Sequence, residues 1–317
     1  MVASDRIQRP PVLVTGASGF VGTVVRAALT GRGSAVRLAL RIVRDAVGGD
    51  TVETGDIESF GGWRTALKGV GCVVHLANVA HVGRRGVAYA RAVNVDATAR
   101  LAEAATDVGV TRFVYVSSAK VHGEETSSGP FDETFPLAPR DPYAELKVEA
   151  EGRLRAIAAR GRLELVVVRP PLVYGPGVKA NFLALLRAVA RGVPLPFALI
   201  SNRRSLVFVG NLADALVRCA ESPAAAGKTY LVSDGSPIST PALCRALGDA
   251  LGRPARLFSF PSTLLELAPP LRKLTRSLEI DDSAIRRELG WTPPLSFEEG
   301  IRTTAHWYLK ESCRARN

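Results

Sequence analysis

The chain has 317 residues, of which 47% are hydrophobic, and a formal net charge of +11. This length is enough for one large or two modest domains, and the apolar content is ample for a buried core. The basic residues are mostly arginines that are spread along the chain, so we expect no nucleic-acid partner. We interpret the charge as solvated faces or as an attraction for polyanionic metabolites.

The N-terminal residues do not predict export, and the longest apolar region does not predict membrane insertion. The first eleven residues are mostly polar and lack the features of a secretory signal. The apolar region from Phe182 to Ile200 is interrupted by arginines and prolines, and it falls short of the roughly 18 apolar residues of a spanning helix. The cysteines have neither CxxC spacing nor nearby histidines: Cys72, Cys219, Cys244 and Cys313. We therefore expect a cytoplasmic protein with reduced thiols, no metal and no membrane partner.

Short β-branched runs alternate with helix-like segments through the first half of the chain. The expected strands are residues 12–15, 35–40, 71–77, 112–117 and 163–169, and the expected helices are 20–30, 89–108 and 143–160. Such alternation predicts a parallel sheet with helices on both faces, and right-handed crossovers make it doubly wound. The fold class is therefore α/β, of the Rossmann type.

Beyond Arg169 the sequence becomes rich in proline and glycine, which indicates a second region. We place a dinucleotide-binding domain at 1–174, with 204–234 returning to it as a strand and a helix. A smaller C-terminal substrate-binding region then comprises 175–203 and 235–317. Its expected elements are helices at 181–191, 241–251, 281–289 and 297–309 and a short strand at 256–260. A cleft between the regions is the default ligand site.

A glycine-rich turn joins the first predicted strand to the first helix. Gly16, Gly19 and Gly22 have the G-x-x-G-x-x-G spacing of a dinucleotide-binding turn in the required context. The glycines let the backbone approach a pyrophosphate, and the helix N-terminus offers unpaired N–H groups and a favourable dipole. We expect the cofactor to contact Gly16, Ser18, Gly19, Phe20, Val21 and Gly22.

The end of the second strand decides which dinucleotide binds. A carboxylate there would bind the ribose 2′-OH, whereas an arginine would pair with a 2′-phosphate. The strand ends at Arg41, with Arg44 three residues later and no carboxylate. We therefore predict NADP(H), with NAD(H) possible. Asp56 and Ile57, after a third strand, are placed to bind the adenine, although Asp56 could equally cap a helix beginning near Ser59.

Tyr143 and Lys147 lie four residues apart, and therefore on one face of a helix. A free tyrosine has a pKa near 10 and transfers protons poorly at neutral pH. The Lys147 ammonium and an oxidised nicotinamide would favour the phenolate. Ser118 follows an apolar strand and could hold the same substrate oxygen while hydride moves at the adjacent carbon. We predict that these three residues are catalytic.

Together these motifs resemble the extended short-chain dehydrogenase/reductase family, in particular its NAD-dependent epimerase/dehydratase branch that acts on nucleotide-activated sugars. The resemblance also rests on His75-Leu76-Ala77-Asn78, Asn94, Tyr115-Val116-Ser117-Ser118, Arg169-Pro170 and Leu289-Gly290-Trp291-x-Pro293. It implies catalytic roles for Ser118, Tyr143 and Lys147, and a contact of Lys147 with the nicotinamide ribose. It implies further cofactor-site roles for Leu76, Ala77, Asn78, Asn94 and Pro170, with Asn94 supporting the active-site helix.

Residues 117–124, 179–182 and 202–206 are similar to a bacterial subgroup that acts on UDP-linked amino sugars in surface-polysaccharide synthesis. This similarity implies a substrate site made of Ser117, Lys120, Lys179, Asn181 and Arg204. Asn181 and Arg204 would contact the nucleotide diphosphate, whose oxygens suit a bidentate guanidinium. From the residues alone, Arg204 could be a strand-edge charge and Asn181 a helix N-cap. His122 stands where many epimerases have tyrosine.

Our leading prediction of function is NADP(H)-dependent reduction of a UDP-linked 4-keto-6-deoxy hexosamine, because Arg41 favours NADPH. The alternative is a UDP-hexose or UDP-N-acetylhexosamine 4-epimerase with tightly bound NAD. A binding or sensing protein without turnover is a third possibility, which the intact Ser118, Tyr143 and Lys147 argue against. Related enzymes are often homodimers through two helices of each subunit, here around 89–108 and 143–160, so we expect a homodimer.

Overall fold

The computed structural model describes residues 10–43, 49–80 and 85–314. The chain forms two compact units. The first comprises Met1–Ser117, Asp141–Val168 and Leu216–Thr229, and the second comprises Ser118–Arg140, Arg169–Ala215 and Tyr230–Asn317. The units divide the chain differently from the predicted boundary at residue 174, because the chain leaves the first unit after Ser117 and returns to it at Asp141.

A seven-stranded sheet in the order β3-β2-β1-β4-β5-β6-β9 forms the core of the first unit. The strand pairs β1–β2, β1–β4, β2–β3, β4–β5 and β5–β6 are all parallel. The order reverses direction between β1 and β4, as in a doubly wound fold. The predicted Rossmann-type sheet is therefore confirmed. The strands are β1 Val12–Thr15, β2 Val36–Leu40, β3 Asp50–Glu53, β4 Cys72–His75, β5 Arg112–Val116, β6 Glu164–Arg169 and β9 Thr229–Leu231.

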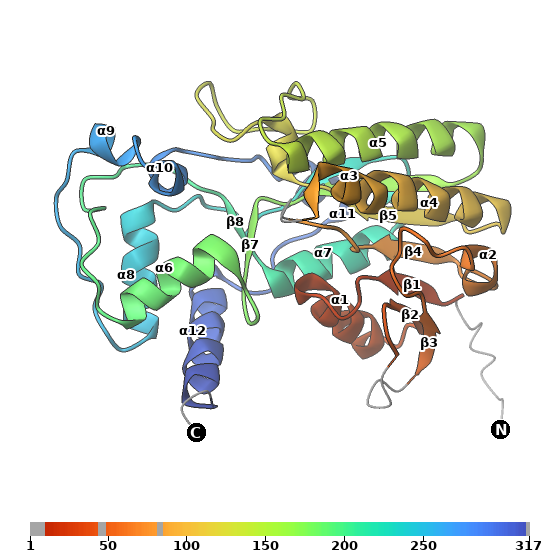
Figure 1. Ribbon diagram of the computed structural model, residues 1–317, viewed down its shortest axis with the longest axis horizontal. Coiled ribbons are helices and arrows are strands. Elements are labelled where there is room, and N and C mark those ends of the chain that lie inside the picture. Colours follow the sequence, from red (N-terminus) through yellow and green to blue (C-terminus); the bar gives the residue numbers. More distant parts are fainter. Residues whose placement is uncertain (1–9, 44–48, 81–84, 315–317) are drawn as a thin grey trace. The chain divides into compact units, whose positions relative to one another are not determined.

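Helices cover both faces of this sheet: α1 lies on one side and α4 and α5 lie on the other (Figure 1). The predicted helix over 89–108 is in fact a continuous run of three parts, of which the middle one is a π-helix. The bounds are α1 Phe20–Gly31, α2 Trp63–Ala66, α3 Gly86–Arg91, the π-helix η1 Ala92–Ala97, α4 Thr98–Asp107 and α5 Pro142–Arg160.

The start of α5 follows from its sequence. Asp141 is the N-cap, and its carboxylate accepts a hydrogen bond of 2.8 Å from the backbone N–H of Ala144. Pro142 occupies the first helical position, where its missing N–H costs nothing, and Gly161 follows the last turn. This cap fixes where the helix begins, and therefore the rotation of Tyr143 and Lys147 about its axis.

The second unit contains a two-stranded parallel sheet, β7 Leu172–Tyr174 and β8 Leu206–Phe208. Of the segment 204–234, predicted to return to the first domain as a strand and a helix, β9 joins the main sheet, whereas β8 pairs with β7. The predicted strand at 256–260 is a single bridge between Leu195 and Leu257. The helices are the 3-10 helix η2 Ala119–His122, α6 Ala180–Ala190, α8 Thr240–Ala250, α9 Ser262–Leu265, α10 Pro269–Thr275, α11 Ser283–Leu289 and α12 Phe297–Arg314.

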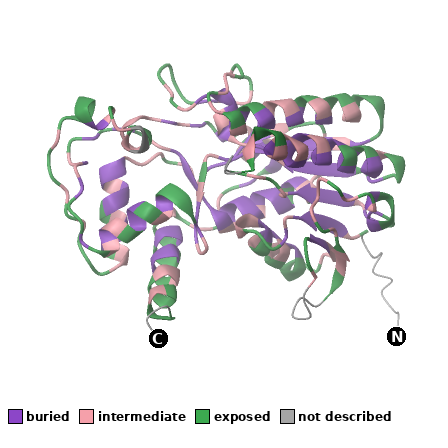
Figure 2. Ribbon diagram, viewed as in Figure 1, coloured by how far each residue is buried: buried purple, intermediate pink, exposed green. Residues whose placement is uncertain are grey.

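Two helical segments lie near the boundaries between the units: α7 Val209–Glu221, which begins in the second unit and ends in the first, and the 3-10 helix η3 Pro223–Ala225. In each unit the buried residues are concentrated on the strands and on the helix faces that meet them (Figure 2). All four cysteines are free, as predicted. Among the described helices, none combines the length and the apolar content needed to cross a bilayer.

Candidate active site

Two positions of the turn after β1 require glycine. Gly16 has a φ of +64°, and a Cβ there would lie 2.8 Å from the backbone nitrogen of Ala77. A Cβ on Gly22 would lie 2.1 Å from the carbonyl oxygen of Gly16. The turn can therefore press closely against β4 and against α1, as a dinucleotide-binding turn must.

The N-terminus of α1 is open to an anion. Gly19 is its N-cap, and no described side chain accepts a hydrogen bond there. Ser18 and Gly19 are exposed. Unsatisfied N–H groups and the positive end of the helix dipole therefore lie where the predicted residues Phe20 and Val21 begin the helix. This arrangement suits the pyrophosphate of a dinucleotide.

A buried hydrogen-bond chain holds the ends of β1 and β4 together. Thr15 Oγ1 accepts from the backbone N–H groups of Leu76 at 3.1 Å and Ala77 at 3.2 Å. Its two lone pairs are thus used, so its hydroxyl hydrogen is donated to His75 Nδ1 at 2.8 Å. The protonated Nε2 of His75 then donates to Thr98 Oγ1 at 2.8 Å. Burial, with a smaller contribution from Lys147, lowers the pKa of His75 to about 3, so the ring is neutral.

This chain positions Leu76 and Ala77, two of the predicted cofactor residues. Sequence reasoning used His75 only as part of a motif and missed its role. The available signal was a histidine that ends an otherwise apolar strand, because such a ring needs two partners when it is buried.

Asn94 fixes the loop that follows β4 from the other side. Its side chain is 1% exposed and belongs to the π-helix η1. Its Oδ1 accepts from the N–H of Val79 at 2.7 Å, and its Nδ2 donates to the carbonyl of Val79 at 3.0 Å. Both ends of the amide are therefore bound to the loop, and Asn94 supports the site rather than offering its amide to a cofactor. Asn78 is exposed and donates to Leu76 O at 3.1 Å.

A carboxylate does lie at the end of β2, and this corrects the sequence analysis. Arg41 Nε is 3.0 Å from Asp56 Oδ1, and both side chains are largely exposed. The cause is the parallel pairing of Leu40 with Glu53, which brings the residues after β3 beside those after β2. Asp56 is not a helix cap, since α2 begins only at Trp63. Arg44 lies outside the described residues.

Lys147 is buried behind Tyr143 on α5. It is 2% exposed, and its Nζ donates to the carbonyl of Val116 at 2.8 Å. The same nitrogen lies 4.7 Å from the ring centre of Tyr115 and 5.7 Å from that of Tyr143. Burial lowers the pKa of Lys147 to about 7, and the charge of Glu151 opposes this shift.

Tyr143 does not have a lowered pKa in the protein alone. Burial and then the charge of Asp141 raise the pKa of its phenol above the ordinary value. Lys147 alone therefore does not lower the pKa of Tyr143. The Lys147 nitrogen faces the rings of Tyr115 and Tyr143 and donates to the Val116 carbonyl. A phenolate at this position needs further positive charge, such as that of a bound oxidised nicotinamide.

Glu151 is a buried carboxylate that sequence reasoning missed. It is 0% exposed, lies one turn beyond Lys147 on α5 and pairs with Arg155 at 2.8 Å. The hydroxyl of Tyr115 is buried nearby without a hydrogen-bond partner in the described chain. Tyr143, Lys147, Glu151 and Arg155 thus form an i, i+4 series of polar residues along one face of the helix. That spacing was visible in the sequence.

Ser118 begins the second unit, whereas Ser117 ends the first. Ser118 caps η2, and its Oγ accepts from the N–H of Lys120 at 3.3 Å. Ser117 is buried, and its Oγ has no partner within the described residues. The carbonyl of Pro170 accepts from the N–H of Ala119 at 2.9 Å and so steadies this loop. Tyr143 and Lys147 belong to the first unit, so the meeting of all three catalytic residues stays a prediction.

His122 is held in one tautomer under the same loop. Its Nε2 lies 3.0 Å from Arg169 Nη1, which can only donate, so Nε2 accepts. Its Nδ1 therefore carries the hydrogen and donates to the carbonyl of Pro136 at 3.3 Å. Both His122 and Arg169 are buried. His122 is therefore suited to this position because its ring accepts a hydrogen bond from the buried Arg169.

Asn181 and Arg204 line one apolar hollow of the second unit. The remaining lining residues are mostly hydrophobic: Leu172, Phe182, Leu185, Leu206, Ile238, Ser239, Thr240, Leu243 and Leu274. Arg204 donates to the carbonyls of Lys273 at 2.7 Å and Arg276 at 3.0 Å, and burial lowers its pKa. Both hydrogen bonds use Nη1, so they hold the guanidinium in place and leave its other nitrogens for a ligand.

The backbone before Asn181 is unusual. Lys179 is the exposed N-cap of α6, so Asn181 lies within the first turn and is not the cap. Between them Ala180 has a φ of +52°, which makes it the one non-glycine residue with positive φ in the described ranges. Such a conformation costs about 1 kcal/mol or more and is often found at functional sites. Lys120, the other predicted substrate residue, pairs with Glu124 at 3.4 Å.

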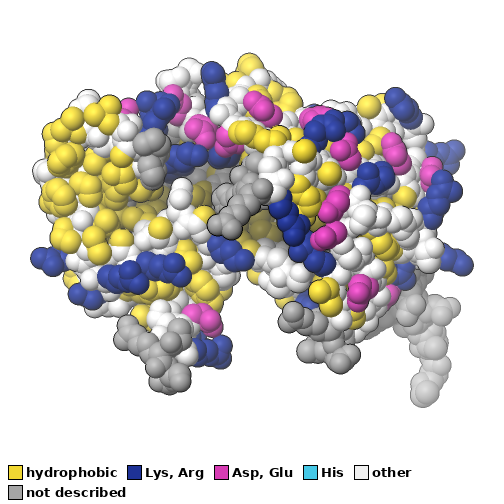
Figure 3. Space-filling model, in the orientation of Figure 1, with side chains coloured by type: hydrophobic (Ala, Val, Ile, Leu, Met, Phe, Trp, Pro, Cys, Tyr) yellow, Lys and Arg dark blue, Asp and Glu magenta, His cyan; other side chains and the backbone are white. Residues whose placement is uncertain are grey.

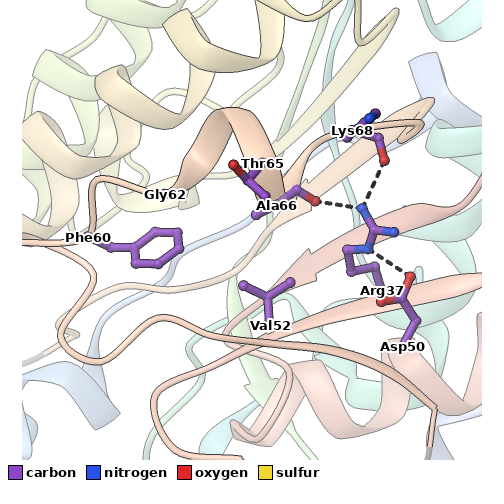
Figure 4. Close-up of a pocket in the computed structure, with 8 residues that line it drawn as sticks. All are labelled: Arg37, Asp50, Val52, Phe60, Gly62, Thr65, Ala66 and Lys68. Atoms are coloured by element: carbon purple, nitrogen blue, oxygen red, sulfur yellow. Dashed lines mark hydrogen bonds and ion pairs between the residues drawn. The ribbon is translucent and has the colours of Figure 1, made fainter.

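A separate open hollow in the first unit is not a cofactor site. It is lined by Arg37, Asp50, Val52, Phe60, Gly62, Thr65, Ala66 and Lys68 (Figure 4). Arg37 and Asp50 lie at the amino ends of β2 and β3, whereas the glycine turn follows the carboxyl end of β1. Arg37 donates to Asp50 at 2.7 Å and to the carbonyls of Ala66 and Lys68, so it serves the structure.

The sequence of residues 12–233 matches the NAD dependent epimerase/dehydratase family. The chain belongs to this family. It is an NAD(P)-dependent enzyme of the extended short-chain dehydrogenase type, in agreement with the resemblance drawn from the sequence. The family assignment explains why the glycine turn, the loop after β4 and the Tyr143–Lys147 pair occur together around one sheet.

Several relatives are similar in sequence to nearly the whole of this chain. A UDP-glucose 4-epimerase of Vibrio cholerae is 40% identical over 328 residues, which cover 99% of this chain and 100% of the relative. A dTDP-glucose 4,6-dehydratase of Streptomyces griseus is 31% identical, with 94% of each chain covered. The structure of MoeE5 in complex with UDP-glucuronic acid and NAD is 27% identical, with a TM-score of 0.79 and 95% and 99% of the two chains covered.

Proposed function

We propose that the protein is a 4-epimerase of UDP-hexoses or UDP-N-acetylhexosamines that retains NAD. The observation that carries this proposal is the 40% identity to a UDP-glucose 4-epimerase across the full length of both chains. The leading prediction from the sequence, an NADPH-dependent 4-ketoreductase, rested on Arg41. Because Arg41 is paired with Asp56, it gives less support to a 2′-phosphate, and the comparisons favour the epimerase.

The first unit has the features needed to hold NAD. The uncapped start of α1 would bind the pyrophosphate, and the exposed Gly19 carries no side chain that would keep it away. Asp56 would accept hydrogen bonds from the adenosine, and Lys147 would donate to the nicotinamide ribose. Bound NAD would supply the hydride chemistry at C4 of the sugar. NAD in the complex with MoeE5 supports this choice.

Tyr143 would remove the proton from the sugar O4 and later return it. Its raised pKa in the protein alone means that the phenol is protonated until a positive charge arrives. Lys147, whose pKa of about 7 already includes the charge of Glu151, would stay charged more readily once a ribose oxygen accepts a hydrogen bond from it. Ser118 would donate a hydrogen bond to O4 and fix its position. Proton transfer is thereby coupled to cofactor binding.

The nucleotide would be held by the second unit. Arg204 would contact the diphosphate, where a charge-assisted bond from a half-buried guanidinium is strong. Asn181 would bind a second oxygen, and the apolar wall of the hollow would accept the uracil ring. Lys120, Lys179 and Ser117 would lie along the rest of the substrate. The complex of MoeE5 with UDP-glucuronic acid supports a UDP-sugar substrate.

Purified protein tests this proposal directly. We expect it to carry NAD and to convert UDP-glucose or UDP-N-acetylglucosamine to the 4-epimer without added cofactor. The Tyr143→Phe variant should keep NAD and lose about 100-fold or more of the activity. If the protein contains no NAD and consumes only 4-keto sugars with added NADPH, the epimerase proposal is wrong and the reductase is restored.

We further propose a cytoplasmic homodimer. Free thiols suit the cytoplasm, and the helical segments around 89–108 and 143–160 would form the dimer interface. Light scattering of the purified protein should give twice the monomer mass. A monomer that is fully active would contradict the dimer.

A further inference from the structure

A group of large hydrophobic side chains is exposed on the second unit. It consists of Val193, Leu199, Phe258, Leu264 and Leu267, which we call the apolar face. Leu267 is 78% exposed, Leu199 61% and Leu264 52%. Hydrophobic side chains gather in this part of the surface, at the left of Figure 3. Leaving such side chains in water costs free energy, so a contiguous group of them indicates an interaction surface.

The apolar face is assembled by the fold from two distant segments. The N–H of Leu195 donates to Arg256 O at 2.8 Å, and the N–H of Phe258 donates to Leu195 O at 3.0 Å. The ring of Phe258 lies 6.4 Å from that of Phe260, which leads into α9. Leu264 lies on α9, and Leu267 follows its end. Neither segment alone is an amphipathic anchor, and this is why the sequence predicted no membrane partner.

The unpaired charges of the segments that form the apolar face are basic. No Asp or Glu occurs between Glu164 and Asp214, or between Asp249 and Glu266. Glu266 itself pairs with Arg276 at 3.0 Å. In the same segments Arg191, Arg253 and Arg256 are exposed. None of the three has an ion pair within the described chain, and dark blue side chains border the lower edge of the apolar region in Figure 3.

These arginines are anchored beside the apolar residues. Arg253 Nη1 donates to Ala190 O at 3.1 Å at the end of α6, and Arg256 belongs to the backbone pair with Leu195. By contrast, Arg91 and Arg153 of the first unit are neutralised by Asp96 and Glu149. Unpaired arginines around protruding leucines can reach anionic groups while their stems cover apolar surface.

We propose that the apolar face docks on the surface of an anionic lipid bilayer. The leucines and Phe258 would enter the boundary between headgroups and acyl chains, and Arg191, Arg253 and Arg256 would bind lipid phosphates. A second copy of the chain is a poorer occupant, because two such faces would bring arginines of the same sign together.

Vesicle co-sedimentation tests the proposal. We expect the purified protein to bind vesicles of phosphatidylcholine with 30% phosphatidylglycerol and to bind pure phosphatidylcholine much more weakly. A double variant, Arg253→Gln with Arg256→Gln, should lose about 25-fold in affinity, from about fivefold per arginine. Leu264→Ser with Leu267→Ser should lose about tenfold. Matched controls outside the apolar face and outside the proposed dimer helices, Arg162→Gln with Arg302→Gln and Leu137→Ser with Leu309→Ser, should bind as the parent does.

Several results would overturn this inference. They are equal binding to neutral and anionic vesicles, no binding to either, or an equal loss in the control variants. A dimer that disappears in the Leu264 and Leu267 variant would assign the apolar face to a second copy. Thermal unfolding of each variant checks that it is folded. Because vesicle binding is measured without substrate, a failure of the proposed epimerase activity would not alter the outcome.

Discussion

The most informative prediction concerns the charge of Lys147 in the protein without cofactor. Its pKa of about 7 in the folded state compares with about 10.4 for a free lysine. The unfolded chain therefore binds one more proton than the folded chain between about pH 7 and pH 10. A base whose pKa is lowered by folding destabilises the fold at low pH, so the free energy of unfolding should rise with pH in this window.

The size of the effect follows from the two pKa values. The slope approaches 1.4 kcal/mol per pH unit, which gives about 2 kcal/mol between pH 7.5 and pH 9. In the Lys147→Met variant this contribution is absent. Urea unfolding of both proteins should therefore show the parent gaining about 2 kcal/mol relative to the variant between pH 7.5 and pH 9.

Parallel curves for the two proteins would refute this reasoning. They would mean that Lys147 stays charged in the empty site and that Glu151 outweighs the cost of burial. The Glu151→Gln variant separates these causes. Because Glu151 raises the pKa of Lys147, its loss should lower that pKa further and start the rise in stability at a lower pH.

Three further predictions concern the turn, the buried histidine and the nucleotide hollow. Gly22→Ala places a Cβ 2.1 Å from Gly16 O, so we expect a loss of about 2 kcal/mol or more of stability and of bound NAD, measured by thermal unfolding and cofactor analysis. The pKa of the buried His75 is about 3, so below about pH 6.5 this imidazole takes up a proton only on unfolding, and the free energy of unfolding falls as the pH falls. The His75→Gln variant should lose less stability in acid than the parent does. An equal loss in both proteins would argue against a neutral His75. Arg204→Lys should raise KM for the UDP-sugar by about tenfold and leave kcat nearly unchanged, and a purely structural role would instead show as lower thermal stability with an unaltered KM.

The sheet and the glycine turn could be predicted because their signals are local. β1 was predicted at its observed bounds, and α5 within one residue, since apolar runs, an N-cap and a proline lie next to each other in the sequence. Glycine spacing directly after a strand likewise fixed the turn. Such features need no knowledge of distant residues.

What could not be predicted depends on pairing between distant segments. Asp56 reached Arg41 only because β3 pairs with β2, and this contact changed the cofactor argument. Within the segment 204–234, β9 joins the main sheet and β8 does not, since the pairing of β8 with β7 cannot be read from either strand alone. The pKa of Tyr143 in the protein alone could not be predicted for a related reason, because burial raises it and the extent of burial depends on distant segments.

The most direct test of the proposed chemistry follows one hydrogen atom. The purified protein, without added cofactor, should be given UDP-glucose that carries deuterium at C4. We predict UDP-galactose that keeps the deuterium at C4, because an epimerase removes and returns the same hydrogen. Product that has lost the label to solvent, or product that forms only with added NADPH, would contradict the proposed function.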